Sequence, residues 1–102
     1  MITVVVKESG KAPEAKQIDG DIKSIQGIVG GYFECHAFSA GTTVYCNEDA
    51  VHQYLPPNIV DMCHGSILRG TVLIMDGDNG LPASKVPRII KALEARAILG
   101  SL

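Results

Sequence analysis

Cysteine and histidine side chains bind metals and act as nucleophiles, and this sequence places four of them in two adjacent pairs. The three cysteines and three histidines are Cys35, His36, Cys46, His52, Cys63 and His64. Structural zinc sites usually take ligands in two pairs, with about two to four residues between the members of a pair. Adjacent strand residues point to opposite faces, so an adjacent pair cannot share a metal there. The spacing therefore predicts core cysteines, surface histidines and no metal site.

Nucleophilic catalysis needs a cysteine or serine beside a base and a group that orients the base. Cys63 and His64 are such a pair, but direct neighbours in sequence seldom form a working dyad. The glycines at 27, 30 and 31 end a predicted helix and no Gly-Lys-Ser/Thr follows, so they do not form a phosphate-binding loop. We therefore predict no catalytic residue and no cofactor, and we expect the protein not to be an enzyme.

A hairpin offers a more promising group of side chains. Two strands are expected at about 32–38 and 42–47, around a loop at 39–41. If the loop has two or four residues, the numbers of paired residues have a constant sum, and Cys35 faces Cys46. A three-residue loop would shift every pair by one and change which side chains share a face.

In the first of these registers, strand alternation separates an apolar face from a polar one. The apolar face, which we expect to join the core, consists of Phe33, Cys35, Ala37, Val44 and Cys46. The opposite face consists of Tyr32, Glu34, His36, Tyr45 and Asn47. Phenol rings, an imidazole, an amide and a carboxylate could stack on a planar ligand and bind its polar edge. The alternative is a solvated face, or one covered by a partner chain.

The remaining strands follow from turn residues and apolar runs. Besides the hairpin, strands are predicted at 2–7, 14–18 and 71–75, and the last of these is apolar enough to be buried on both faces. The segment 48–64 is expected to be an irregular loop that packs against the core, since Pro56 and Pro57 prevent a regular helix or a central strand.

Two helices complete the order of elements. One is predicted at 22–29, where Asp21 supplies an N-cap and Gly30 a stop. The other begins near Ser84, with Pro87 in its first turn. The predicted order is ββ-α-ββ-loop-β-α, which indicates an α+β fold with a largely antiparallel sheet.

Length and charge restrict the functional classes. The chain has 102 residues and a net charge of −2, so we expect a single domain, residues 1–102. Its nine basic residues form no run, which argues against nucleic-acid binding. The apolar start is short and interrupted, and no segment approaches the length of a membrane span. Three cysteines without close spacing are typical of reduced thiols, and we expect a cytoplasmic protein without membrane contact.

Several segments together resemble one family. They are Ser-Ile-Gln-Gly-Ile-Val-Gly-Gly-Tyr-Phe-Glu at 24–34, Val-Tyr-Cys-Asn-Glu at 44–48, Pro-Asn at 57–58 and Gly-Thr-Val-Leu-Ile at 70–74. On these segments the chain resembles the uncharacterised family known as domain of unknown function 3846. The resemblance covers nearly the whole chain. It implies an origin in bacteriophages, plasmids and other mobile elements, and it implies no assigned activity.

The motif residues of that family correspond to Gly30, Gly31, Tyr32, Glu34, Asn47, Glu48 and Asn58. Where the family would have a basic, glycine-rich loop after Asn-Glu, this chain has an acidic and apolar segment at 49–55. Ligand contacts of that loop therefore do not transfer. Combined with the hairpin face, the candidate ligand-binding residues are Tyr32, Glu34, His36, Tyr45, Asn47, Glu48 and Asn58.

Three functions remain open from the sequence. The first is a non-enzymatic protein that binds a ligand, by analogy with small phage proteins that sequester nucleotide-derived immune signals of the host. The second is a protein-interaction module that inhibits or modulates a host protein. The third is a small enzyme. In each case we expect a homo-oligomer, because a small sheet with aromatic outer positions is commonly covered by a second copy.

Overall fold

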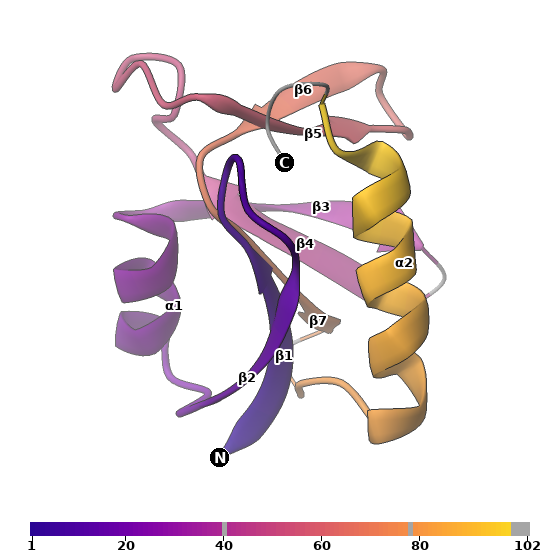
Figure 1. Ribbon diagram of the computed structural model, residues 1–102. Coiled ribbons are helices and arrows are strands. Elements are labelled where there is room, and N and C mark those ends of the chain that lie inside the picture. Colours follow the sequence, from indigo (N-terminus) through magenta and orange to yellow (C-terminus); the bar gives the residue numbers. More distant parts are fainter. Residues whose placement is uncertain (40, 78, 99–102) are drawn as a thin grey trace.

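The computed structural model describes residues 1–39, 41–77 and 79–98. A five-stranded antiparallel sheet forms its centre, and the strand order is β2-β1-β7-β4-β3 (Figure 1). Its strands are β1 (Ile2–Lys7), β2 (Glu14–Ile18), β3 (Phe33–Ser39), β4 (Thr42–Asn47) and β7 (Val72–Asp76). A second, two-stranded sheet consists of β5 (Pro57–Asp61) and β6 (Ser66–Arg69). Helix α1 (Ile22–Val29) and helix α2 (Val86–Arg96), which follows a 3₁₀ turn at Ala83–Lys85, lie on opposite sides of the large sheet. The predicted α+β class is confirmed.

The central strand is β7, as its apolar run predicted. Its residues Val72, Leu73, Ile74 and Met75 are fully buried, and the strand pairs with β1 on one side and β4 on the other. No described helix is long and apolar enough to cross a membrane.

Both helix starts agree with the sequence prediction. The Asp21 side chain accepts a hydrogen bond from the Ser24 backbone N–H at 3.0 Å, which caps α1. Gly30 ends the helix in a left-handed conformation, with φ +87°. Pro87 lies in the first turn of α2, where its missing N–H costs no hydrogen bond.

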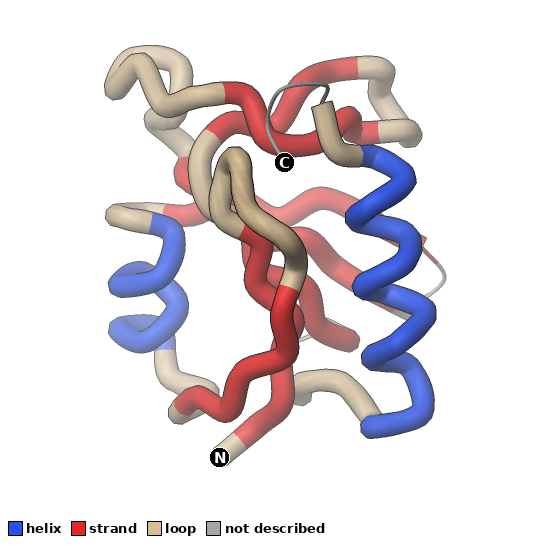
Figure 2. Tube along the Cα trace, viewed as in Figure 1, coloured by secondary structure: helices blue, strands red, loops and turns tan. Residues whose placement is uncertain are grey.

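The predicted irregular loop at 48–64 is wrong in its second half. The part up to Pro56, drawn in tan in Figure 2, is irregular, but Pro57–Asp61 forms the edge strand β5, and a turn at 62–65 leads into β6. Proline is tolerated as the first residue of a strand, since no ladder hydrogen bond is lost there. The expected packing of the loop is also wrong at its tip, where Val51 and Tyr54 are 70% and 93% exposed.

The hairpin register is shifted by one residue from the predicted one. Cys35 pairs with Tyr45 and Glu34 pairs with Cys46, and the register changes at an irregularity between Ala37 and Ser39. An extra residue in one strand moves every later side chain to the other face. The predicted contact between Cys35 and Cys46 is therefore wrong.

Cross-strand partners share a face of the sheet, and the observed pairing defines the two faces. One face carries Val5, Ile74, Val44 and His36, and the other carries Val6, Leu73, Tyr45 and Cys35. The second sheet covers the His36 face, since the Asp61 carboxylate of β5 lies 3.9 Å from that imidazole. Strand β5 also contacts α2, while α1 lies on the opposite side of the large sheet (Figure 1).

Candidate functional site

Asn47 joins the end of α1 to the loop that follows β4. Its Nδ2 donates to the Val29 carbonyl oxygen at 3.2 Å and to Gln53 Oε1 at 3.3 Å. Its Oδ1 accepts a hydrogen bond from the Asp49 backbone N–H at 2.7 Å. The side chain is only 2% exposed, so these bonds replace its contacts with water. Asn47, predicted on an open polar face, is thus a buried connector.

The two glycines of the motif bring the chain back against Asn47. Gly30 and Gly31 have φ of +87° and +152°, in the region that favours glycine, and a Cβ at either would lie within 3.7 Å of Asn47 Nδ2. The Tyr32 carbonyl oxygen then accepts a hydrogen bond from the Glu48 N–H at 3.0 Å. The Val-Gly-Gly-Tyr and Asn-Glu segments are therefore bonded to each other.

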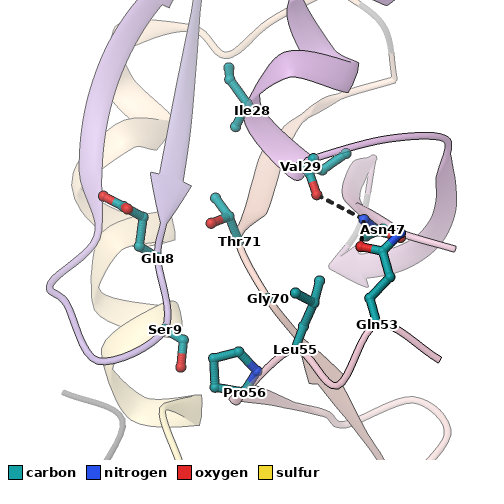
Figure 3. Close-up of a pocket in the computed structure, with 11 residues that line it drawn as sticks. Glu8, Ser9, Ile28, Val29, Asn47, Gln53, Leu55, Pro56, Gly70 and Thr71 are labelled. Atoms are coloured by element: carbon teal, nitrogen blue, oxygen red, sulfur yellow. Dashed lines mark hydrogen bonds between the residues drawn. The ribbon is translucent and has the colours of Figure 1, made fainter. Parts of the chain in front are cut away.

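A pocket of about 440 Å³ lies beside this junction (Figure 3). Its lining comes from the β1–β2 turn, the end of α1, the loop after β4 and the residues before β7. The lining residues are Glu8, Ser9, Ile28, Val29, Gly30, Asn47, Gln53, Leu55, Pro56, Gly70 and Thr71. We call it the motif pocket, because two residues of the family motif, Gly30 and Asn47, line it.

Asn58 holds the segments beneath the motif pocket. Its Nδ2 donates to the carbonyl oxygens of Lys7 and Gly70, both at 2.8 Å, and its Oδ1 accepts from Lys7 Nζ at 2.5 Å. Both side chains are fully buried, and burial lowers the pKa of Lys7. Sequence reasoning missed Lys7 because it closes an apolar strand and looked like a solvated end. The available signal was strand alternation, which puts Lys7 on the same face as the buried Val5.

The other candidate residues do not share one face. Tyr32 and Glu48 remain together and line, with His52, a neighbouring pocket of about 330 Å³. Glu34 and His36 lie on the face toward the second sheet. Tyr45, predicted to be outward-facing, is buried because the register differs.

Tyr45 and Phe33 pack together inside the fold. The Tyr45 hydroxyl donates to the Gly77 carbonyl oxygen at 2.6 Å. Its ring meets Phe33 edge to face, with 5.3 Å between centroids. The predicted separation of these two residues onto opposite faces is therefore wrong, and Tyr45 serves packing instead of facing a ligand.

In this α+β protein, the end of α1 is thus bonded to the end of β4 beside a small pocket. The chain belongs to the family described as Domain of unknown function (DUF3846), whose model matches residues 2–96. The resemblance found in the sequence is thereby confirmed over nearly the whole chain. No curated protein and no solved structure is similar enough to count as a match.

Proposed function

We propose that this protein binds a small molecule in the motif pocket and does not transform it. The observation that carries the proposal is the position of the pocket, which is formed where the Val-Gly-Gly-Tyr and Asn-Glu segments meet. Its volume of about 440 Å³ is within the range of small-molecule sites. Clamping by Asn47 and Asn58 holds its walls in place before a ligand arrives, which reduces the ordering cost of binding.

The lining suits a ligand with an apolar body and hydrogen-bond donors at its edge. Ile28, Leu55 and Pro56 supply apolar surface, as in most ligand pockets. Glu8 and Gln53 supply acceptor oxygens, and an ionised carboxylate only accepts. An exocyclic amine or ring N–H of a heterocycle is a suitable donor for Glu8.

Within this proposal, the ligand is a nucleotide-derived immune signal of the host, which the protein sequesters. The mobile-element origin implied by the family resemblance motivates this choice. Leu55 and Pro56 also line a second pocket of about 480 Å³, which contains Tyr54 and Arg69. A guanidinium binds phosphate, and Arg69 offers one in this second pocket. The two adjoining pockets thus support a base near Glu8 and a phosphate near Arg69.

Thermal-shift screening followed by calorimetric titration tests the proposal. The panel contains nucleosides, cyclic mononucleotides and dinucleotides, and ADP-ribose derivatives, and chromatography checks that the ligand is recovered unchanged. Glu8→Gln is the pocket variant and Glu14→Gln the matched control, because both glutamates are exposed and lie near a lysine side chain. A lost charged hydrogen bond of about 1.5–3 kcal/mol weakens binding by roughly tenfold or more in Glu8→Gln. No shift across the panel, or equal binding by both variants, contradicts the proposal.

An interaction module that inhibits or modulates a host protein is the second candidate, and the exposed apolar residues around the loop favour it. Val51, Tyr54 and Ile67 are 70%, 93% and 49% exposed, and Val51 and Ile67 line one shallow pocket. Tyr54 also has φ +55°, which is uncommon for a residue other than glycine. Such groups mark interaction surfaces, including those between copies of one chain.

Light scattering and pull-down experiments distinguish a homo-oligomer from a module that binds a host protein. A homo-oligomer that uses this surface gives a concentration-dependent mass, which Val51→Asp reduces to that of one chain. A host partner is retained from lysate by the wild type and lost with Val51→Asp. A monomer that retains no partner refutes the interaction module but leaves the titration result for the motif pocket unaffected.

A further inference from the structure

Two histidines and a buried aspartate meet where the β5–β6 turn lies against β3. His64 Nδ1 lies 3.0 Å from Asp61 Oδ2, and His36 Nδ1 lies 3.9 Å from the same oxygen. The three ligand atoms are within 4.8 Å of one another. None of these residues lines the motif pocket, so the cluster is independent of the proposed function. The sequence prediction missed it because it considered only ligands that are close in the chain.

The Asp61 carboxylate is held in place before any ion binds. Its Oδ1 accepts a hydrogen bond from the Cys63 N–H at 3.0 Å, which leaves Oδ2 directed at the histidines. The residue is 5% exposed. Burial alone would raise the pKa of Asp61, but hydrogen bonds from His64 and the Cys63 N–H, with the two nearby imidazoles, outweigh burial and lower it. The buried carboxylate therefore presents one oxygen, Oδ2, to both histidines.

His36 has a second ring nitrogen that the described part of the chain leaves without a hydrogen bond. This atom, Nε2, is buried and lies 3.4 Å from Glu34 Oε2. A metal-binding histidine generally donates its other ring N–H to a carboxylate or carbonyl, which fixes the tautomer. With its proton on Nε2, beside the Glu34 carboxylate, the imidazole would have a free lone pair on Nδ1, on the side of Asp61.

We propose that His36 Nδ1, Asp61 Oδ2 and His64 Nδ1 bind a divalent first-row transition-metal ion, with zinc as the preferred ion. Imidazole nitrogen and carboxylate oxygen are ligands that zinc accepts at about 2.0–2.2 Å. Tetrahedral ligands at that distance are separated by about 3.3–3.6 Å. The separations of 3.0 and 3.9 Å between Asp61 Oδ2 and the two imidazole nitrogens lie on either side of this range, and all three atoms lie within 4.8 Å of one another, so an ion would draw the ligands together. His64 is 65% exposed, which leaves a fourth position open to water.

The neighbouring thiol does not complete the site. Cys46 lies near Glu34 and His36, and the three could also surround an ion. Cys46 is only 3% exposed, whereas the His64 side chain is 65% exposed. An incoming ion therefore reaches the site formed with Asp61 and His64 more readily, and it belongs on the Nδ1 side of His36.

Zinc titration of the untagged full-length chain, stripped with a chelator and then competed against a chromophoric zinc indicator, tests the proposal. We expect one equivalent to bind with a dissociation constant of about micromolar or tighter. His64→Ala removes a ligand on an exposed side chain and should weaken binding by more than about tenfold. Glu34→Gln should weaken it by roughly tenfold, as for partners that orient a ligand. His52→Ala is the matched control, because this exposed histidine is also bonded to an aspartate three residues away.

Two spectroscopic measurements on the wild type do not depend on how variants fold. Zinc should shift the imidazole NMR signals of His36 and His64 and leave those of His52 in place. Cobalt substitution should give a spectrum without thiolate-to-metal charge transfer. The proposal is overturned if the wild type fails to bind zinc, if His64→Ala binds as the wild type does, if His52→Ala loses as much affinity, or if a thiolate band appears.

Discussion

Replacing Gly70 with alanine tests the packing of the floor of the motif pocket. Gly70 has φ +77°, and a Cβ there would lie 2.7 Å from Leu55 Cδ1. Gly10 has almost the same φ, +78°, but its Cβ would have no atom within 4 Å. The two alanine variants therefore share the backbone cost and differ in the contact with Leu55, so Gly10→Ala is the matched control.

The expected magnitudes follow from these two terms. A left-handed backbone costs a residue other than glycine about 1–2 kcal/mol, which is the whole loss of unfolding free energy expected for Gly10→Ala. Forcing an extra methyl group against a packed side chain costs a further 1–3 kcal/mol or so. Gly70→Ala should therefore lose about 2–5 kcal/mol, a large part of the roughly 5–15 kcal/mol stability of a small domain. Leu55 can relieve the contact only by rotating, which alters the pocket wall.

Urea unfolding followed by far-ultraviolet circular dichroism measures both losses. The double variant Gly70→Ala/Leu55→Ala, compared with Leu55→Ala alone, should show only the backbone cost, because the clash has been removed. If Gly70→Ala and Gly10→Ala agree within about 0.5 kcal/mol, Leu55 does not pack against Gly70 and the reasoning about the pocket floor is refuted.

Two further substitutions probe polar contacts. Asn47→Ala removes three hydrogen bonds and leaves backbone partners unpaired. We expect it to lose about 2–4 kcal/mol of unfolding free energy in the same urea assay. Asn79→Ala, at an exposed turn, is the control and should change this free energy by less than about 0.5 kcal/mol. Hydrogen bonds from Lys85, at 2.9 and 3.0 Å, lower the pKa of Asp76 in the folded state. The stability this provides is present above 3.8, the ordinary pKa of an aspartate, and is lost as the pH falls through the lower folded pKa. Asp76→Asn should therefore lower the melting temperature at pH 7 and make no difference below the folded pKa. The exposed control Asp19→Asn should have no effect at either pH. An equal effect of the two variants would contradict the stabilising role of the Asp76–Lys85 contact.

Features that depend on neighbouring residues were predictable from the sequence. The α1 boundaries follow from a capping side chain at Asp21 and a left-handed glycine at Gly30, and both are local chemistry. The apolar run of β7 identified the central strand for the same reason. The α+β class and the order of the elements other than β5 and β6 then follow with little information about distant contacts.

The site depended on contacts that sequence spacing does not encode. Asn58 binds Lys7 from 51 positions away, and no local pattern relates the two. His36 meets Asp61 because a separate sheet covers β3, and that sheet was expected to be an irregular loop. Pro56 and Pro57 do prevent a regular helix or a central strand. The prediction failed because Pro57 can still begin an edge strand.

The buried position of Asn58 depends on an extra residue in β5. Strict alternation along β5 would put Asn58 on one face and both Ile59 and Asp61 on the other. The pairing of β5 with β6 changes register between Pro57 and Ile59, and Asn58, Ile59 and Asp61 are all buried. A bulge redirects side chains in this way. It allows Asn58 to be buried beneath the motif pocket on the same strand whose Asp61 meets His36, so a single short strand supports both the proposed ligand site and the proposed metal site.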